Sequence, residues 1–228
     1  MLNSIQYAKK LFARPVVFHK VTGLFNVENQ VLTRVPAVAI VGESNVGKST
    51  LLNKLLNLKE PRDKVKLGSH QIPYSPVSPI PGRTRHVFRF DLGNRLSICD
   101  LPGYGAAHAP QEVQQTWNQL VEKFLNLASI KRVLVLVSAN KGVTKLDEAV
   151  MTMLCDKGIT VQIILTKVDL LSRGSLHDAT SQCVAHILRS PGGKFFPYIH
   201  AISAENELGM DELKCDLAAI AADLEPIR

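Results

Sequence analysis

Eight consecutive residues have the types and the spacing needed to hold a chain of phosphates: Gly42-Glu43-Ser44-Asn45-Val46-Gly47-Lys48-Ser49. They match the pattern Gly-x4-Gly-Lys-Ser, in which glycines let the backbone amides point inward around phosphate oxygens. Lys48 would bridge the β- and γ-phosphates, and the Ser49 hydroxyl would bind Mg²⁺. Such a pattern arises by chance in about one chain in a hundred of this length. We therefore predict that these residues, together with Thr50, bind nucleotide phosphates.

A second group, Thr166-Lys167-Val168-Asp169, follows an apolar run and could select the base. The carboxylate of Asp169 can accept hydrogen bonds from N1–H and from the exocyclic amine of guanine, a pair of donors that adenine lacks. The stem of Lys167 would lie over the ring. Alone, such a tetrapeptide is most often solvated surface, but its position downstream of a phosphate-binding loop favours guanine recognition. Ser203-Ala204 would add a backbone amide for the guanine O6.

A third group could contact the metal and the γ-phosphate. In Asp100-Leu101-Pro102-Gly103, the carboxylate could hold Mg²⁺ through water and the glycine amide could meet the γ-phosphate. Thr84, within Pro81-Gly82-Arg83-Thr84-Arg85, could close on both with its hydroxyl and carbonyl. The predicted catalytic residues are Lys48, Thr84 and Gly103, and the predicted metal ligands are Ser49, Thr84 and Asp100. Each of these segments alone would be interpreted as an ordinary turn or loop. Because all the motifs occur in the correct order along the chain, an independent chance occurrence of the whole set is negligible.

The elements that must position these groups alternate along the chain. Apolar, β-branched runs predict strands, and apolar residues at helical spacing predict helices. The expected strands are 38–41, 87–92, 96–99, 132–137, 160–165 and 198–202, and the expected helices are 50–56, 110–128, 146–156, 176–189 and 210–224. This alternation predicts an α/β fold of the P-loop NTPase type, with a mainly parallel six-stranded sheet and helices on both faces. Gly93-Asn94 predicts a hairpin, hence one antiparallel edge strand.

The length of 228 residues and the hydrophobic content of 46% suit one domain, which we place at residues 36–228. Residues 1–35 are either an extension with a first element of the fold or a targeting segment, because residues 1–20 carry basic side chains and no acidic one. Residues 57–85 contain five prolines and are expected to form a long mobile loop ahead of Thr84.

Composition narrows the class of protein further. The formal charge of +7 makes a polyanion such as RNA a candidate partner. The four cysteines form no Cys-x-x-Cys pair, which is typical of reduced thiols in an intracellular protein. We find neither a membrane-spanning run nor the apolar core of a signal peptide, so we expect a protein that is not secreted. We also expect a monomer. Cytoplasmic and organellar locations both remain open.

With this ordered set, the sequence resembles the translation-factor-related P-loop GTPases and, within them, the EngB/YihA family. The resemblance is carried by residues 44–49, 81–85, 100–105 and 166–169, and it runs from about residue 36 to the C-terminus. It implies binding of GTP and GDP with Mg²⁺, slow hydrolysis, and a switch role in assembly of the large ribosomal subunit, with that subunit or rRNA as partner. Two segments depart from the family pattern: 57–85 is longer, and 137–142 replaces an acidic-basic signature.

Tyr104 follows Gly103, where Ras-like proteins place the glutamine that orients the attacking water. A phenol is a poor substitute, so we expect hydrolysis near or below roughly 10⁻⁴ s⁻¹ without help from a partner or a cation. Asn45 occupies the position that helps to hold K⁺ in potassium-activated GTPases; bracing of the loop is the alternative. Two other functions remain: a nucleotide-binding scaffold with negligible turnover, and a P-loop small-molecule kinase, although an arginine-rich lid is not evident.

Overall fold

The computed structural model describes residues 2–21, 35–58, 87–105, 130–190, 192 and 194–222. Several sequence-based expectations lie outside these residues. They are Thr84 with its neighbours in 81–85, nearly all of the 57–85 loop, and the helix expected at 110–128.

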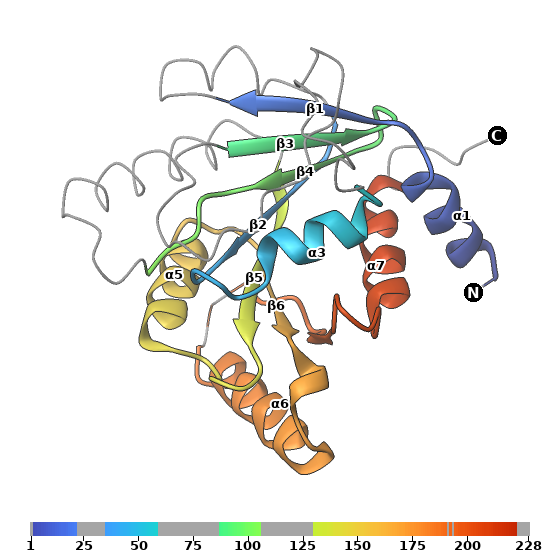
Figure 1. Ribbon diagram of the computed structural model, residues 1–228. Helices are drawn as coiled ribbons and strands as arrows, with labels where there is room; N and C mark the ends of the chain where they lie inside the picture. Colours follow the sequence, from blue (N-terminus) through green and yellow to red (C-terminus); the bar gives the residue numbers. More distant parts are fainter. Residues whose placement is uncertain are drawn as a thin grey trace, which may run out of the picture.

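A single twisted sheet organises the described part of the chain (Figure 1). Its strand order is β1-β3-β4-β2-β5-β6-β7. The strands are β1 (Val16–Val21), β2 (Ala37–Gly42), β3 (Val87–Leu92), β4 (Leu96–Asp100), β5 (Ile130–Ser138), β6 (Val161–Thr166) and β7 (His200–Ala201). From β4 to β7 every neighbouring pair is parallel, whereas β3 is antiparallel to both of its neighbours.

The predicted fold class is confirmed, with a correction to the edge of the sheet. We expected six strands and an antiparallel edge strand, but the sheet has seven and its edge strand is β1. The antiparallel strand β3 therefore lies second from the edge. The additional strand forms because β1 pairs with β3 along its whole length, from Val16 opposite Leu92 to Val21 opposite Val87.

Helices cover both faces of the sheet (Figure 1). One face carries α1 (Leu2–Phe12), α3 (Lys48–Leu55) and α7 (Met210–Ala222), and the other carries α5 (Lys145–Asp156) and α6 (Arg173–Leu188). Because successive strand residues point to opposite faces, Val38 and Ile40 pack with α3 and α7. Ala39 belongs to the core on the opposite face, beneath α5.

The observed elements follow the predicted ones closely. Strand β3 has the predicted bounds, and the strand expected at 198–202 is reduced to β7. Helix α6 starts earlier than expected because the Ser172 side chain caps it by accepting from the Ser175 amide. Residues 2–21 belong to the same body, since α1 packs along α7 and β1 extends the sheet. None of the described helices is long and apolar enough to cross a membrane.

Candidate nucleotide-binding site

The predicted phosphate loop joins the buried end of β2 to the first turn of α3. Asn45 and Gly47 have left-handed φ angles of 66° and 104°, which turn the chain sharply and favour residues without a bulky Cβ. A Cβ on Gly42 would lie 2.7 Å from Val46 Cγ1 and 3.0 Å from Leu136 Cβ. The loop therefore has the tight geometry that a phosphate cradle needs, with the N-terminal amides of α3 at its end.

Lys48 and Asp100 meet at the carboxyl ends of the neighbouring parallel strands β2 and β4. The Lys48 ammonium lies 2.6 Å from Asp100 Oδ1, and both side chains are almost fully buried. Burial raises the pKa of the Asp100 carboxyl, and the ammonium group opposes that rise. A buried carboxylate in this position needs a positively charged partner. Either the Lys48 ammonium or a bound metal cation can supply that charge. Ser49 follows Lys48 in the first turn of α3.

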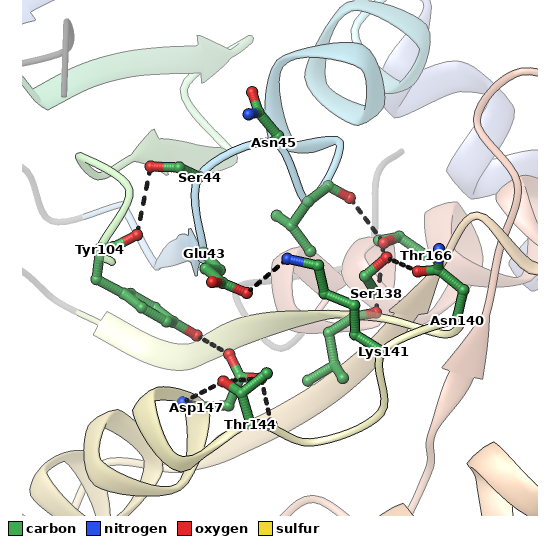
Figure 2. A network of polar contacts seen from close by, with 12 residues as sticks. Glu43, Ser44, Asn45, Tyr104, Ser138, Asn140, Lys141, Thr144, Asp147 and Thr166 are labelled. Atoms are coloured by element: carbon green, nitrogen blue, oxygen red, sulfur yellow. Dashed lines mark hydrogen bonds and ion pairs between the residues drawn. The ribbon is translucent and has the colours of Figure 1, made fainter. Parts of the chain in front are cut away.

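The segment that contains Gly103 is tied directly to the phosphate loop. The Tyr104 amide donates to the Gly42 carbonyl at 3.2 Å, and the Ser44 amide donates to the Tyr104 carbonyl at 3.0 Å. The Ser44 hydroxyl reaches the same carbonyl at 3.4 Å (Figure 2). A Cβ on Gly103 would lie 3.2 Å from the Gly42 carbonyl oxygen. Glycine therefore lets the two segments approach closely.

The segment predicted to select the base, residues 166–169, braces the same loop from the other side. The buried Thr166 hydroxyl donates to the Val46 carbonyl at 2.7 Å (Figure 2). The Lys167 ammonium, on a residue with φ 59°, donates to the Asn45 carbonyl at 2.7 Å. Asp169 follows in the short 3-10 helix η1 (Val168–Leu170) and is exposed. Its carboxylate is therefore accessible at the edge of the sheet that carries the phosphate loop.

The predicted Ser203-Ala204 segment lies beside η1, because the Val168 amide donates to the Ile202 carbonyl at 3.3 Å. The Ser203 amide donates to the Leu208 carbonyl at 3.1 Å. The buried Ser203 hydroxyl accepts from the Asn206 amide at 3.1 Å. These bonds fix the loop and leave the Ala204 amide as the candidate donor to a base.

The structure thus brings together every predicted site segment that it describes. Thr84 lies outside the described residues. These features are those of a nucleotide-binding edge in a P-loop domain: a phosphate loop, a carboxylate at the end of the adjacent strand with a glycine just beyond it, and across the sheet the exposed carboxylate that we predicted to select the base.

Two contacts of this site were not predicted from the sequence, one to α5 and one to the turn that precedes it. The Tyr104 hydroxyl donates to Asp147 Oδ1 at 2.6 Å, and the Lys141 ammonium lies 3.3 Å from Glu43 Oε2 (Figure 2). Burial raises the pKa of Tyr104, and the carboxylates of Asp147 and Glu43 raise it further, so the phenol stays protonated. The pattern Thr144-x-x-Asp147 before an apolar run signals a helix start, but no sequence pattern indicates its link to Tyr104.

Comparison with known proteins agrees with this site. Residues 37–167 match the family described as 50S ribosome-binding GTPase. The chain is 31% identical over 222 residues to a probable GTP-binding protein EngB of Caulobacter vibrioides, covering 97% of this chain and 90% of the relative. It is 34% identical to the corresponding protein of Rickettsia conorii, covering 92% of this chain and 90% of that one.

Solved structures show the same fold. A crystal structure of a probable GTP-binding protein engB superposes with a TM-score of 0.58 at 19% identity, covering 82% of this chain and 99% of that one. Era in complex with MgGDPNP and nucleotides 1506–1542 of 16S ribosomal RNA gives a TM-score of 0.59 at 25% identity, covering 85% of this chain and 59% of that one.

The fold and the site together are those of a P-loop GTPase domain, which binds GTP and GDP and hydrolyses GTP. Within that class, the chain belongs to the EngB family of GTP-binding proteins. The family resemblance predicted from the motifs is therefore confirmed.

Proposed function

We propose that this protein is a slowly hydrolysing GTP switch that acts in assembly of the large ribosomal subunit. The observation that carries the proposal is that the Tyr104 hydroxyl donates a hydrogen bond to Asp147, so it is engaged and not available to orient an attacking water. The large-subunit role is supported by the family description, which names binding to the 50S ribosome. A ribosomal RNA partner is supported by Era, which was solved with nucleotides of 16S ribosomal RNA. A net charge of +7 suits a polyanionic partner.

In this proposal the nucleotide is held at both ends. The phosphates bind to the loop and helix start at Gly42, Glu43, Ser44, Asn45, Val46, Gly47, Lys48, Ser49 and Thr50. Asp169 reads guanine, while Thr166 and Lys167 hold the base-selecting segment against the phosphate loop. The Ser203-Ala204 turn adds an amide from Ala204.

Ser49, Asp100 and Thr84 are the residues that would hold Mg²⁺, which neutralises charge on the β- and γ-phosphates when it is bound. The buried Asp100 carboxylate fits this role because it already requires a cation, which Lys48 supplies at 2.6 Å. When nucleotide and Mg²⁺ bind, Lys48 would leave the Asp100 carboxylate and contact phosphate oxygens instead. Gly103 offers its amide to the γ-phosphate from the segment that is bonded to the phosphate loop.

Slow turnover follows from the chemistry of Tyr104. A glutamine after the glycine orients water in Ras-like proteins, whereas this phenol is buried and bonded to α5. A partner or a monovalent cation must therefore complete the site. Asn45 is the residue we assign to K⁺, because it occupies the position in the phosphate loop that helps to hold K⁺ in potassium-activated GTPases. Lys167 holds the loop at this residue by donating to the Asn45 carbonyl.

The proposal is tested by measuring phosphate release from GTP with and without purified large ribosomal subunits, with small subunits as the control. We expect slow release alone, faster release with large subunits, and co-sedimentation that is stronger with a GTP analogue than with GDP. Binding of GTP with no release in any condition would instead identify a nucleotide-binding scaffold. Equal release and equal sedimentation with both subunits would contradict a role specific to the large subunit.

A further inference from the structure

The contact between Tyr104 and Asp147 joins two segments that are 43 residues apart. Both residues are buried, with 7% and 2% exposure. The other carboxylate oxygen of Asp147, Oδ2, accepts from the amide and the hydroxyl of Thr144, both at 2.9 Å. The Asp147 amide in turn donates to the Thr144 hydroxyl at 3.2 Å. The capping box at the start of α5 therefore fixes the carboxylate that receives the Tyr104 hydroxyl.

The main chain of Tyr104 is held at the opposite end. Its amide and carbonyl bond to Gly42 and Ser44 of the phosphate loop. Tyr104 is thus anchored by its backbone to the loop and by its side chain to α5, as Figure 2 shows. Gly103, one peptide earlier, lies against the same loop, because a Cβ built on it would be 3.2 Å from the Gly42 carbonyl oxygen.

We propose that Asp147 is a positioning residue for recognition of the γ-phosphate, and that it acts through the hydroxyl of Tyr104 to hold the Gly103 amide in place. This inference rests on the proposed function, in which Gly103 meets the γ-phosphate. GDP has no group at that position, whereas the phosphate loop and the base site serve both nucleotides. The Tyr104–Asp147 hydrogen bond therefore contributes to the preference for GTP over GDP.

The role differs from that of a simple helix cap. Thr144 caps α5 through its hydroxyl, but its amide would still donate to Asp147 after the hydroxyl is removed. Thr144→Ala therefore weakens the cap and keeps the bond between Asp147 and Tyr104. Tyr104→Phe does the reverse, because it deletes one hydroxyl and leaves Thr144 and Asp147 paired.

The experiment measures dissociation constants of the full chain for GDP and for a non-hydrolysable GTP analogue. We expect Tyr104→Phe and Asp147→Ala each to lower the preference for the analogue about five- to tenfold while GDP affinity changes by less than about threefold. In the Asp147→Ala background, adding Tyr104→Phe should change the preference little further, since both remove the same bond. Thr144→Ala should keep the wild-type preference.

Thermal unfolding of each variant establishes which variants are folded. If only one of Tyr104→Phe and Asp147→Ala is folded, that variant alone is sufficient for comparing the nucleotide preference with the wild type. An unchanged preference in a folded variant would overturn the inference. So would an equal loss in Thr144→Ala, because the effect would then belong to the helix cap. If the wild-type chain bound neither nucleotide, the proposed function itself would fail, and the two failures are therefore distinguishable.

Discussion

The ammonium group of Lys48 lies 2.6 Å from a carboxylate oxygen of Asp100, in surroundings where both side chains are nearly excluded from water. The pair joins the first turn of α3 to the end of β4. The lysine that should bridge phosphates and the carboxylate that should support the metal thus neutralise each other. This charge balance explains how a site built for an anionic ligand and a cation can be buried without either.

Replacing this lysine should make stability more sensitive to pH. Burial already raises the pKa of Asp100 above 3.8, and Lys48→Met removes the ammonium that opposes the rise. A raised pKa gives stability that is complete below 3.8 and is lost as pH rises through the folded-state value. Urea unfolding without nucleotide should therefore show the variant falling below wild type above about pH 4, by roughly 1–3 kcal/mol at neutral pH. A gap that is constant with pH would contradict this account.

The Thr166 hydroxyl should matter for both nucleotides, because it holds the Val46 carbonyl of the phosphate loop. Thr166→Val keeps the shape of the side chain and removes the donor. We expect it to weaken binding of GTP and GDP alike by about tenfold, with Thr166→Ser retaining most of the affinity. Titration with a fluorescent nucleotide measures both. Full affinity in the valine variant would show that the loop does not need this brace.

The rate of hydrolysis should depend on the monovalent cation. If Asn45 helps to hold K⁺ beside the phosphates, phosphate release should be about tenfold faster in KCl than in NaCl at equal ionic strength. Asn45→Gly suits the φ of 66° at this position and removes the side chain. It should abolish the difference while retaining GDP binding. Equal rates in the two salts for the wild type would rule out the potassium site.

A cluster of polar groups around Asp216 should stabilise the far end of the sheet. Burial would raise the pKa of Asp216, but hydrogen bonds from His200, Gln162 and Arg132 outweigh it and hold the pKa at about 2. A depressed pKa gives stability that is present above 3.8 and is lost as pH falls toward about 2.

Asp216→Asn should therefore lower the free energy of unfolding by about 2 kcal/mol at neutral pH, with the deficit shrinking between pH 4 and pH 2. Asp178→Asn, an exposed position on α6, is the matched control and should change stability by less than about 0.5 kcal/mol. Urea denaturation across this pH range measures both. A deficit in Asp216→Asn that did not shrink with acid would exclude the charge as its cause.

Features that depend only on residues close together in the sequence could be predicted from it. Apolar runs with turn residues between them gave β3 and β4 nearly to the residue. The phosphate loop and the 166–169 segment could be recognised because each needs particular residue types in consecutive positions. Their meeting at one edge follows from parallel strands, whose carboxyl ends lie together.

Contacts between distant segments were not predictable in this way. Tyr104 could be recognised as a departure from glutamine, but its bond to Asp147 depends on how α5 packs against the sheet. The apolar start of β1 (Val16–Val21) allowed a first element of the fold to be expected there, but its antiparallel pairing with β3 at the edge of the sheet could not be predicted. Such features are set by tertiary packing rather than by local pattern.

We propose above all that Asp169, which is exposed at the sheet edge that carries the phosphate loop, selects guanine. The most direct test of this proposal is binding of GTP and XTP to the wild type and to Asp169→Asn. An amide at this position cannot accept both guanine donors but can pair with the oxygen that xanthine carries instead of the amine. We predict that preference moves from GTP to XTP, whereas an unchanged preference for GTP would contradict the account.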